Sequence, residues 1–381
     1  MARLETRIAV VTAIERADAG GIWGRAQVEG ESGDRKIIAY PTLTGPLTVG
    51  DTVLLNTTAT AMNLGTGGVD FVMGVLPLPV AQRPLNAASL PSPTPSPEEG
   101  GDNRASEPPI TGGQGGMLEA GGKNTEHIMK LRYTPMQHAV DAVEMGDSWN
   151  EAHSDLNGTF VVACLLHSQV ALVAAGAKAA NPAARIAYVM TDSAALGLGF
   201  SKLVVQLKEA GLIDATLTCG QSFGGDYECV SLPAALLAAK HVAGADVIIV
   251  APGPGMAGTG TTYGFSGVEQ AWTLDIAAKL GGRAIFCLRA SEADSRERHQ
   301  GISHHSRTVL TLCNCKPILP WPQGFDGPPS GALLAQSEPG LRLLVEKGIT
   351  VTSMGRTVEQ DPLFFHVSCA AGYAAASPGF V

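Results

Sequence analysis

Hydrophobic and polar positions alternate with a regular period over the longer, C-terminal part of the chain. From residue 126 onward, short apolar runs typical of buried strands are separated by segments of about a dozen residues with helical spacing. This order is typical of βαβ units, in which helices cover both faces of a mostly parallel sheet. We therefore predict a Rossmann-like α/β domain at residues 126–381. Strands are expected at 160–166, 185–190, 214–219, 246–250 and 283–288, helices at 169–180, 199–210, 231–242, 267–280 and 304–312, and two more elements near 349–352 and 363–376.

The first 80 residues have the shorter period of β structure. Several short apolar stretches are separated by glycine-containing turns, which predicts a small β-barrel at residues 1–80. The barrel is interpreted as a docking or structural module. It lacks the interleaved basic and aromatic residues on which an oligonucleotide-binding barrel stacks its ligand. Strands are expected at 6–14, 24–29, 36–40, within 45–56, and at 69–75.

Between these two regions the apolar periodicity disappears. Residues 81–125 are rich in Pro, Ser and Gly, and they include four prolines at alternate positions in 91–97. A segment of this composition cannot bury enough apolar surface to offset the entropy of ordering it, so we predict a disordered insertion. Residues 127–135 alternate again and are expected to add an edge strand that joins the two domains.

Composition narrows the class of protein. The chain has 381 residues, of which 45% are hydrophobic and 16% charged, so it can build a large core. Its net charge of −9 argues against nucleic acid as the main partner, because a phosphate backbone requires a basic surface. No apolar run is long enough to span a membrane, and the N-terminus lacks the apolar core of a signal peptide. The seven cysteines have irregular spacings that indicate no disulfide framework, and a cytoplasmic protein is predicted.

The strongest chemical signal is a glycine-rich loop that follows the apolar run at 246–250. Glycines leave backbone N–H groups uncovered, and a helix is predicted to begin soon afterwards at 267. These amides are therefore expected to hold a phosphate or carboxylate group. The residues predicted to bind the ligand are Gly253, Gly255, Gly258, Thr259 and Gly260.

Two familiar phosphate motifs do not fit this loop. Its spacing satisfies G-x-G-x-x-G formally, but a dinucleotide fingerprint opens its helix within the motif and stands at the first strand of the sheet. A P-loop is excluded because Gly258 is followed by Thr259, where that motif requires lysine. The alternative to a ligand site is a turn that allows a helix to pack close to the sheet.

Titratable residues follow several of the predicted strands, at the edge where open parallel sheets bind ligands. Ser303 is a predicted N-cap, which places His304 and His305 in the first turn of a helix. The positive end of a helix disfavours an imidazolium, so at least one of the pair is expected to be neutral at pH 7. The alternative is two ordinary loop histidines. The predicted catalytic set is His304, His305, His167, Asp192 and Asp226.

These observations predict a protein that binds a small anionic, phosphate-bearing ligand. If it is an enzyme, a hydrolase or transferase is favoured over redox chemistry, and the His/Asp set would also suit a divalent metal of unknown identity. The alternative is a non-catalytic metabolite sensor or scaffold protein. No membrane partner is expected, and a homo-oligomer is left open. The hypothesis requires that the loop at 253–260 lies beside His304 and His305.

Several of these segments also carry a resemblance that covers most of the chain apart from the insertion. Together they resemble the domain of unknown function 3866 family of bacterial proteins. The resemblance implies a bacterial cytoplasmic protein with the same two-part architecture, and it implies no reaction. The resembling segments are 39–46, 53–58, 127–135, 166–169, 188–192, 223–226, 253–270 and 296–305.

Overall fold

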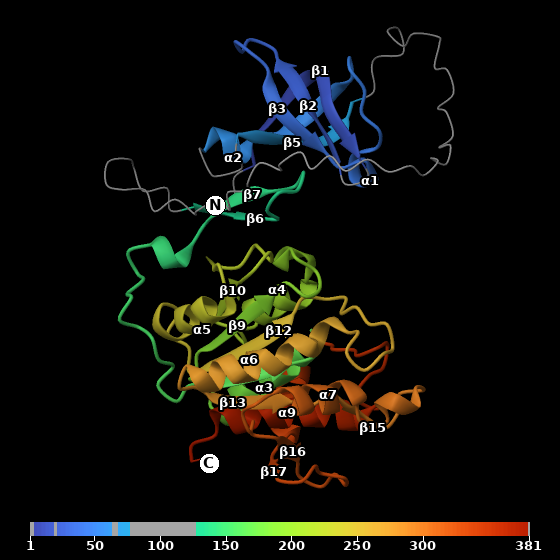
Figure 1. The fold of residues 1–381 in the computed structure, drawn as a ribbon. Helices are drawn as coiled ribbons and strands as arrows, with labels where there is room; N and C mark the ends of the chain where they lie inside the picture. The colour runs from blue at the N-terminus through green and yellow to red at the C-terminus, as the bar shows by residue number, and fades with distance from the viewer. Residues whose placement is uncertain (1–3, 19–20, 63–67, 77–126, 380–381) are drawn as a thin grey trace. The chain divides into compact units, whose positions relative to one another are not determined.

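The computed structural model describes residues 4–18, 21–62, 68–76 and 127–379, which belong to two compact units (Figure 1). Leu131–Ala139 belongs to the same unit as the N-terminal strands. The other unit comprises Glu126–Lys130 and Val140–Val381. The insertion predicted at 81–125 lies outside the described residues.

The N-terminal unit contains a closed five-stranded barrel, as predicted. The strand order is β1-β2-β3-β5-β4, and β4 pairs with β1 to close the ring. Alternation of side chains builds the interior, because in β2 the buried Ala26 and Val28 flank the partly exposed Gln27. The elements are β1 (Thr6–Asp18), β2 (Gly21–Val28), β3 (Arg35–Ala39), α1 (Pro41–Thr44), β4 (Thr52–Asn56), α2 (Thr58–Ala61) and β5 (Val69–Val75).

The second unit is built on a six-stranded sheet in which every strand pair is parallel. The strand order is β11-β10-β9-β12-β8-β13. The central strands are buried along their whole length, which is why they appear in the sequence as continuous apolar runs. The strands are β8 (Phe160–Cys164), β9 (Ile186–Thr191), β10 (Ala215–Thr218), β11 (Tyr227–Glu228), β12 (Val247–Pro252) and β13 (Arg283–Cys287).

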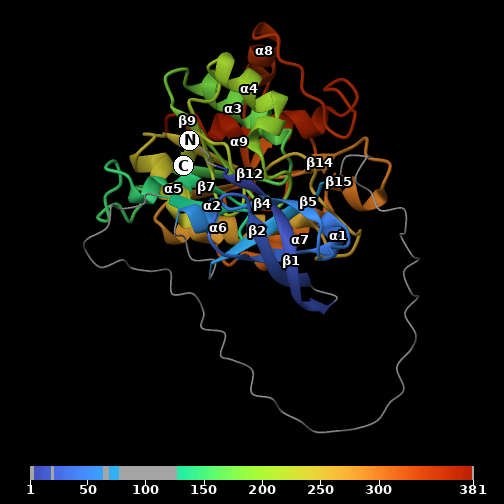
Figure 2. The ribbon, with the colours of Figure 1, turned by 90° about the horizontal axis from the view of Figure 1, so that it is seen from above.

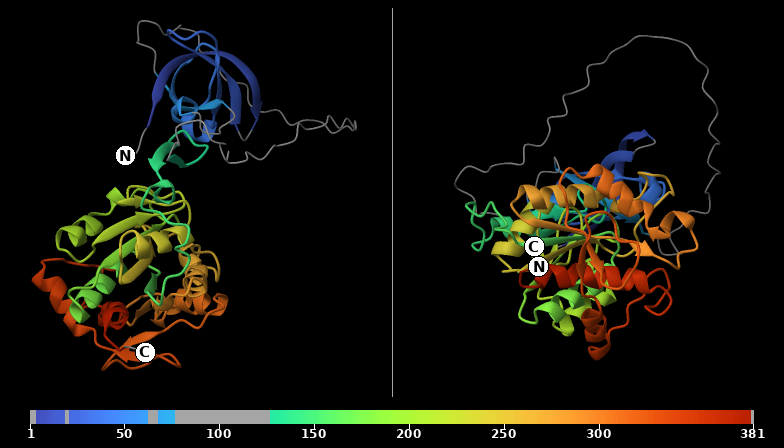
Figure 3. Two further views of the ribbon diagram at one scale, coloured as in Figure 1. Left: turned by 90° about the vertical axis from the view of Figure 1, so that its left-hand side faces the viewer. Right: turned by 90° about the horizontal axis from the view of Figure 1, so that it is seen from below.

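Helices form two layers, one on each face of this sheet. Crossovers between parallel strands are right-handed, so the helices that follow β8 and β9 lie on one face. The chain then reverses direction along the sheet, so the helices before and after β12 lie on the other face (Figures 2 and 3). The first layer holds α3 (Gln169–Ala180), α4 (Lys202–Glu209), α8 (Glu338–Glu346) and α9 (Pro362–Ala376), and the second holds α5 (Leu232–His241), α6 (Gln270–Lys279) and α7 (His304–Leu312).

The abundance of glycine and alanine has a packing role in the first layer. Helices α3 and α9 approach so closely that a Cβ atom at Gly176 would collide with the backbone oxygen of Cys369. A Cβ at Gly372 would likewise collide with the backbone oxygen of Val173. Larger side chains here would separate the helices and open voids in the core.

The predicted elements agree with the observed ones except at a few positions. Residues 349–352 form no regular element, and β6 (His127–Lys130) pairs with β7 (His138–Asp141) instead of joining the edge of either larger sheet. Helix α8 was not predicted. Two predicted helices begin later than expected, because 3₁₀ turns at Leu198–Phe200 and Ser266–Glu269 precede α4 and α6. No described helix is long and apolar enough to cross a membrane.

Candidate functional site

The carboxyl edge of the parallel sheet contains the point at which the two helix layers diverge. Strands β8 and β12 are neighbours, but the chain leaves β8 toward α3 on one face and β12 toward α6 on the other. Ligands of open α/β sheets bind in the crevice at such a topological switch point. The predicted His167 follows β8, and the glycine-rich loop follows β12.

The start of the glycine-rich loop is fixed by close backbone contacts. A Cβ at Gly253 would collide with the backbone oxygen of Ala195, and the amide of Ala195 donates to the oxygen of Pro254 at 3.0 Å. Farther along, the amide of Ser266 donates to the oxygen of Ala257 at 2.9 Å. Gly253 therefore serves close packing of the loop against Ala195, and a second contact fixes the loop at Ala257.

The exposed part of the loop presents uncommitted amides. Within the described residues, the amides of Gly255, Gly258 and Gly260 have no protein acceptor. Gly255 and Gly260 have φ values of 90° and 83°, which residues with a Cβ atom rarely adopt. Thr259 differs, because its amide and its hydroxyl both donate to the oxygen of Gly264, at 2.7 and 3.1 Å. The glycine amides, and not Thr259, are thus available to an anion.

Three histidines form a compact cluster at the start of α7. The ring centroids of His304 and His305 lie 4.2 Å apart, and His299 lies 4.9 Å from each of them. His299 and His305 are almost fully buried. Ser303 is the N-cap of α7, as predicted, and its Oγ accepts from the amide of His305 at 3.2 Å. Sequence reasoning included the pair at 304–305 but assigned no role to His299.

The cluster is held at the end of β13 by backbone hydrogen bonds. The amide of Ser303 donates to the oxygen of Arg289 at 2.9 Å. The amide of Arg289 in turn donates to Oγ of Ser306 at 2.9 Å. These bonds fix the first turn of α7 relative to the sheet, so the imidazoles are carried by a rigid element.

The imidazoles are held in their neutral form. Burial, followed by the positive charge of Arg289, lowers the pKa of His305 to about 3 and that of His299 to about 4. The pKa of His304 is also lowered, by burial and then by Arg298. The lowered pKa values agree with the expectation that at least one of His304 and His305 is neutral. The main cause, however, is burial together with nearby arginines, and not the helix N-terminus.

The glycine-rich loop and the histidine cluster lie side by side. The ring of Phe265 stacks on that of His305, with centroids 3.9 Å apart and planes 12° from parallel. Oγ1 of Thr308, on α7, donates to the backbone oxygen of Thr262 at 3.3 Å. The chain that directly follows residues 253–260 is therefore in contact with His305 and with α7.

One arginine lies over the loop. A Cβ at Gly260 would be 3.6 Å from Nη2 of Arg298, so the guanidinium lies within van der Waals distance of this part of the loop. Arg298 is exposed, and no described carboxylate forms an ion pair with it. The neighbouring arginines differ, because Asp294 binds Arg289 at 3.3 Å and Arg296 at 2.9 Å. Arg298 is thus the cation of this group left for an external anion.

His167 stands at the switch point but is fully engaged. Its Nδ1 lies 3.2 Å from the oxygen of Pro252, and its Nε2 lies 2.6 Å from Oγ of Ser201. Burial lowers its pKa to about 4. Among the described residues, no ring contact or hydrogen bond links it to the imidazoles of α7. The structure therefore gives His167 a bracing role between β8, β12 and α4.

Asp192 follows β9 on the other half of the edge, whereas Asp226 precedes the parallel strand β11 and lies beside the start of β10, away from the carboxyl edge. Asp192 accepts from the amide of Gln221 at 2.8 Å, and Asp226 forms an ion pair with Lys208 and accepts from the amide of Thr216 at 2.9 Å. Strand β10, which carries Thr216, is separated from β13 by three strands, or roughly 19 Å at the usual strand spacing. Asp226 therefore does not join the histidine cluster.

Glu269 is a titratable group at this edge that sequence reasoning missed. One of its carboxylate oxygens accepts from the hydroxyls of Thr191 and Ser193, the latter at 2.7 Å, and burial raises its pKa. The sequence contained a signal, because Ser266 and Glu269 have the spacing of a capping box. In the structure this carboxylate ties the start of α6 to the end of β9.

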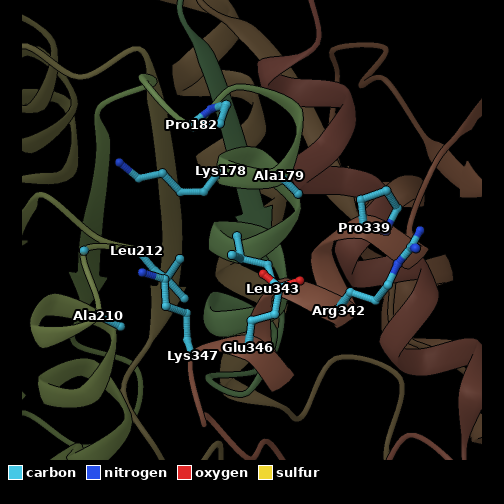
Figure 4. A pocket seen from close by; sticks show the side chains of 11 residues that line it. Lys178, Ala179, Pro182, Ala210, Leu212, Pro339, Arg342, Leu343, Glu346 and Lys347 are labelled. Carbon is cyan, nitrogen blue, oxygen red and sulfur yellow. The ribbon is translucent and has the colours of Figure 1, made fainter.

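A hollow of about 470 Å³ lies at the opposite edge of the sheet (Figure 4). It is lined by the last turns of α3 and α4 and by α8, with Lys178, Arg342 and Lys347 among its side chains. Lys178 is paired with Asp214 at 3.0 Å. This hollow contains none of the predicted site residues, and it lies at the amino ends of the strands.

A comparison with known protein families assigns the chain to one of them. The family described as "Protein of unknown function (DUF3866)" matches residues 36–372. The chain belongs to this family. The match extends from β3 of the barrel into α9, so the resemblance noted from the sequence is confirmed. No curated protein and no solved structure matches the chain.

Proposed function

We propose that the α/β unit, a Rossmann-like domain, binds a small phosphate-bearing anion at the switch point and acts on it by hydrolysis or group transfer. The observation that carries this proposal is the placement of Arg298 beside Gly260. An unpaired guanidinium there adjoins a loop whose glycine amides have no protein acceptor. Guanidinium groups and backbone amides are the groups with which proteins most often bind phosphate.

The neighbouring imidazoles supply acid–base chemistry for such a ligand. His304 has a lowered pKa, so its ring is neutral at pH 7 and has a lone pair. Its Nε2 has no hydrogen-bond partner among the described residues. A water molecule or substrate hydroxyl near the bound phosphate would transfer its proton to this nitrogen, which is the role of a general base.

The alternative proposal is a non-catalytic metabolite sensor. It is favoured by the commitments of the other predicted acid–base groups, since His167, Asp192 and Asp226 are all engaged in bonds that hold the fold. A sensor needs the anion site but no turnover. An assay for phosphate released from the bound ligand separates the two proposals, because only the enzyme releases it.

The anion site can be tested with a matched pair of arginine variants. Binding of inorganic phosphate, pyrophosphate and a panel of nucleotides and sugar phosphates is measured by calorimetry, with EDTA present. Arg298→Ala is expected to weaken the best ligand by about tenfold or more, because a charge-assisted hydrogen bond contributes about 1.5–3 kcal/mol. Arg342→Ala, at another exposed arginine beside the hollow in Figure 4, is expected to leave affinity unchanged. Equal affinity in the wild type and Arg298→Ala would rule the site out.

We also propose the cytoplasm of a bacterium as the compartment of this protein. Support comes from the seven cysteines, all of which are free thiols although several are close in space. Cys164 and Cys287, for example, are register partners on adjacent strands. Reducing compartments keep such thiols unpaired.

A further inference from the structure

We propose that His299, His304 and His305 form the binding site of one divalent transition-metal ion of the zinc type. One ring nitrogen from each residue lies within 4.8 Å of the other two. Nitrogens bound to one zinc ion at about 2.1 Å lie about 3.4 Å apart in tetrahedral geometry. Small rotations of the three side chains close the remaining gap.

The three rings are packed together, and one of their nitrogens is left without a partner in the described residues. His299 is 1% exposed and His305 is 6% exposed, and their rings contact one another and that of His304. Nε2 of His304 is buried, yet it has no hydrogen-bond partner in the described part of the chain. A buried polar atom without a partner costs about 1–3 kcal/mol. A metal ion supplies the missing partner.

The donor set selects the class of metal. Three imidazole nitrogens and no carboxylate point to zinc or a neighbouring transition metal, since calcium and magnesium require oxygen ligands. Asp294, a nearby carboxylate, is already bound by Arg289 and Arg296. Its carboxylate is thus already used in these ion pairs and does not serve as a metal ligand.

Outer contacts orient the rings before any metal binds. Nδ1 of His299 lies 2.7 Å from Oγ of Ser303, which leaves its Nε2 to face the cluster. Phe265 stacks on His305 and fixes the plane of that ring. Hydrogen bonds from the second nitrogen of a ligating histidine are the usual support of metal sites.

One contact has to change when the metal binds. Nη1 of Arg289 lies 3.3 Å from Nδ1 of His305. Ligation through Nε2 leaves Nδ1 protonated, so this nitrogen no longer accepts a hydrogen bond from the guanidinium. Arg289 then turns wholly to Asp294, which it already contacts at 3.3 Å. The ion pair keeps the arginine charge from opposing the metal.

When Nε2 of His304 binds the metal, it cannot also act as the general base, and the three protein ligands leave a coordination position for water or for an oxygen of the anion. The placing of an anion oxygen at that position is the one step that rests on the proposed function. It is suggested by the loop that carries Gly260 and by the guanidinium of Arg298, both of which adjoin the cluster. Metal binding itself requires no anion. The metal site and the anion site can therefore fail separately.

The test is a titration of the full-length chain, stripped with EDTA and then dialysed, with Zn²⁺ alone and with Co²⁺ alone. One Zn²⁺ per chain is expected, and Co²⁺ should give the visible absorption of a nitrogen-ligated ion. His304→Ala should weaken Zn²⁺ binding at least about 100-fold, since even loss of an outer contact typically costs roughly 10–100-fold. His304 makes no side-chain hydrogen bond among the described residues, so this variant should fold, and an unchanged Tm verifies that.

A control uses another pair of neighbouring histidines in this unit. His153 and His241 have ring centroids 4.1 Å apart, away from α7, and His153→Ala should leave Zn²⁺ binding unchanged. Binding of Zn²⁺ that is absent in the wild type, undiminished in His304→Ala, or lost in His153→Ala overturns the proposal. The phosphate titration with EDTA and Arg298→Ala reports on the anion site independently.

Discussion

Two halves of the parallel sheet contain similar polar residues in opposite situations. Around β9 and β10, the carboxylates of Asp192 and Asp226 are bound by backbone amides and by Lys208. Around β12 and β13, three kinds of group have no partner in the described residues: the guanidinium of Arg298, Nε2 of His304, and the amides of Gly255, Gly258 and Gly260. One half stabilises the fold, and the other retains groups that can bind a ligand.

The difference shows that residue type does not distinguish a structural polar group from a functional one. Aspartate and histidine after a parallel strand are good candidates for a site, and both halves satisfied that criterion. What separates them is whether the hydrogen-bonding capacity of each group is already used. A group whose capacity is fully used stabilises the protein, whereas an unsatisfied one costs stability and persists where it serves binding.

The largest effect is expected from Asp294, which is the structural exception within the half that we propose binds the ligand. Its buried carboxylate pairs with Arg289, Arg296 and Arg356. Asp294→Ala leaves the buried Arg289 without its partner, and we expect the free energy of unfolding to fall by about 3–5 kcal/mol. Urea denaturation measures this free energy of unfolding. Arg298→Ala, nearby but unpaired, should change stability by less than about 0.5 kcal/mol, and a similar loss in both variants would contradict the distinction.

The next effect concerns pH and His167. Burial lowers its folded-state pKa to about 4, whereas the unfolded chain titrates near 6.5. Below pH 6.5 the unfolded state therefore binds a proton that the folded state excludes, and stability is lost as the pH falls toward 4. The shift corresponds to roughly 3 kcal/mol between pH 7 and pH 4.

His167→Gln isolates this contribution from those of the other histidines. Its absolute stability at pH 7 is expected to be lower, because the bond to Ser201 is lost or weakened. The decrease in stability between pH 7 and pH 4 should nevertheless be smaller than in the wild type by about that amount. If the free energy of unfolding depended on pH equally in the two proteins, His167 would not be buried as a neutral ring.

Much of the architecture could be predicted because its signals are local. The alternation of apolar runs and the N-cap at Ser303 placed α3 and α7 at their observed bounds. Helix α8 was not predicted, because its amphipathic pattern follows a segment rich in proline and glycine. No strand of the main sheet directly precedes it, so the alternation of strands and helices gave no signal there. Strand order also lies outside any local pattern, since it depends on which apolar strands pair across the sheet.

The candidate site was predictable only in part, for the same reason. The loop at 253–260 and the pair His304 and His305 were identified from adjacent residues. The inclusion of His299 depends on a 3₁₀ turn and on its bond to Ser303, which no periodicity reveals. The exclusion of Asp226 depends on the approach of Lys208 from α4, a contact between distant segments.

A moderate effect is expected from Asp226 on the structural half. Its carboxylate accepts from Lys208 and from both the amide and the hydroxyl of Thr216. Asp226→Asn removes the charge from these bonds, and because the group is partly exposed we expect a loss of about 1–2 kcal/mol in the free energy of unfolding. Affinity for phosphate and for Zn²⁺ should not change. A variant with normal stability and weakened ligand binding would place Asp226 in the functional half after all.

The smallest effect tests the shape of the glycine-rich loop itself. Gly255 has a φ of 90° with open space around it, so Gly255→Ala is opposed by backbone strain alone and should cost about 1 kcal/mol. Gly258 does not have a positive φ, and an added Cβ would make an ordinary contact at 3.6 Å, so Gly258→Ala should be nearly neutral. Thermal unfolding of the two variants makes the comparison. A cost at 255 alone means that the loop holds its amides in one arrangement before the anion arrives, and less of the binding energy is then lost to ordering. Equal stability of both variants would instead indicate a loop that takes its shape only around the ligand.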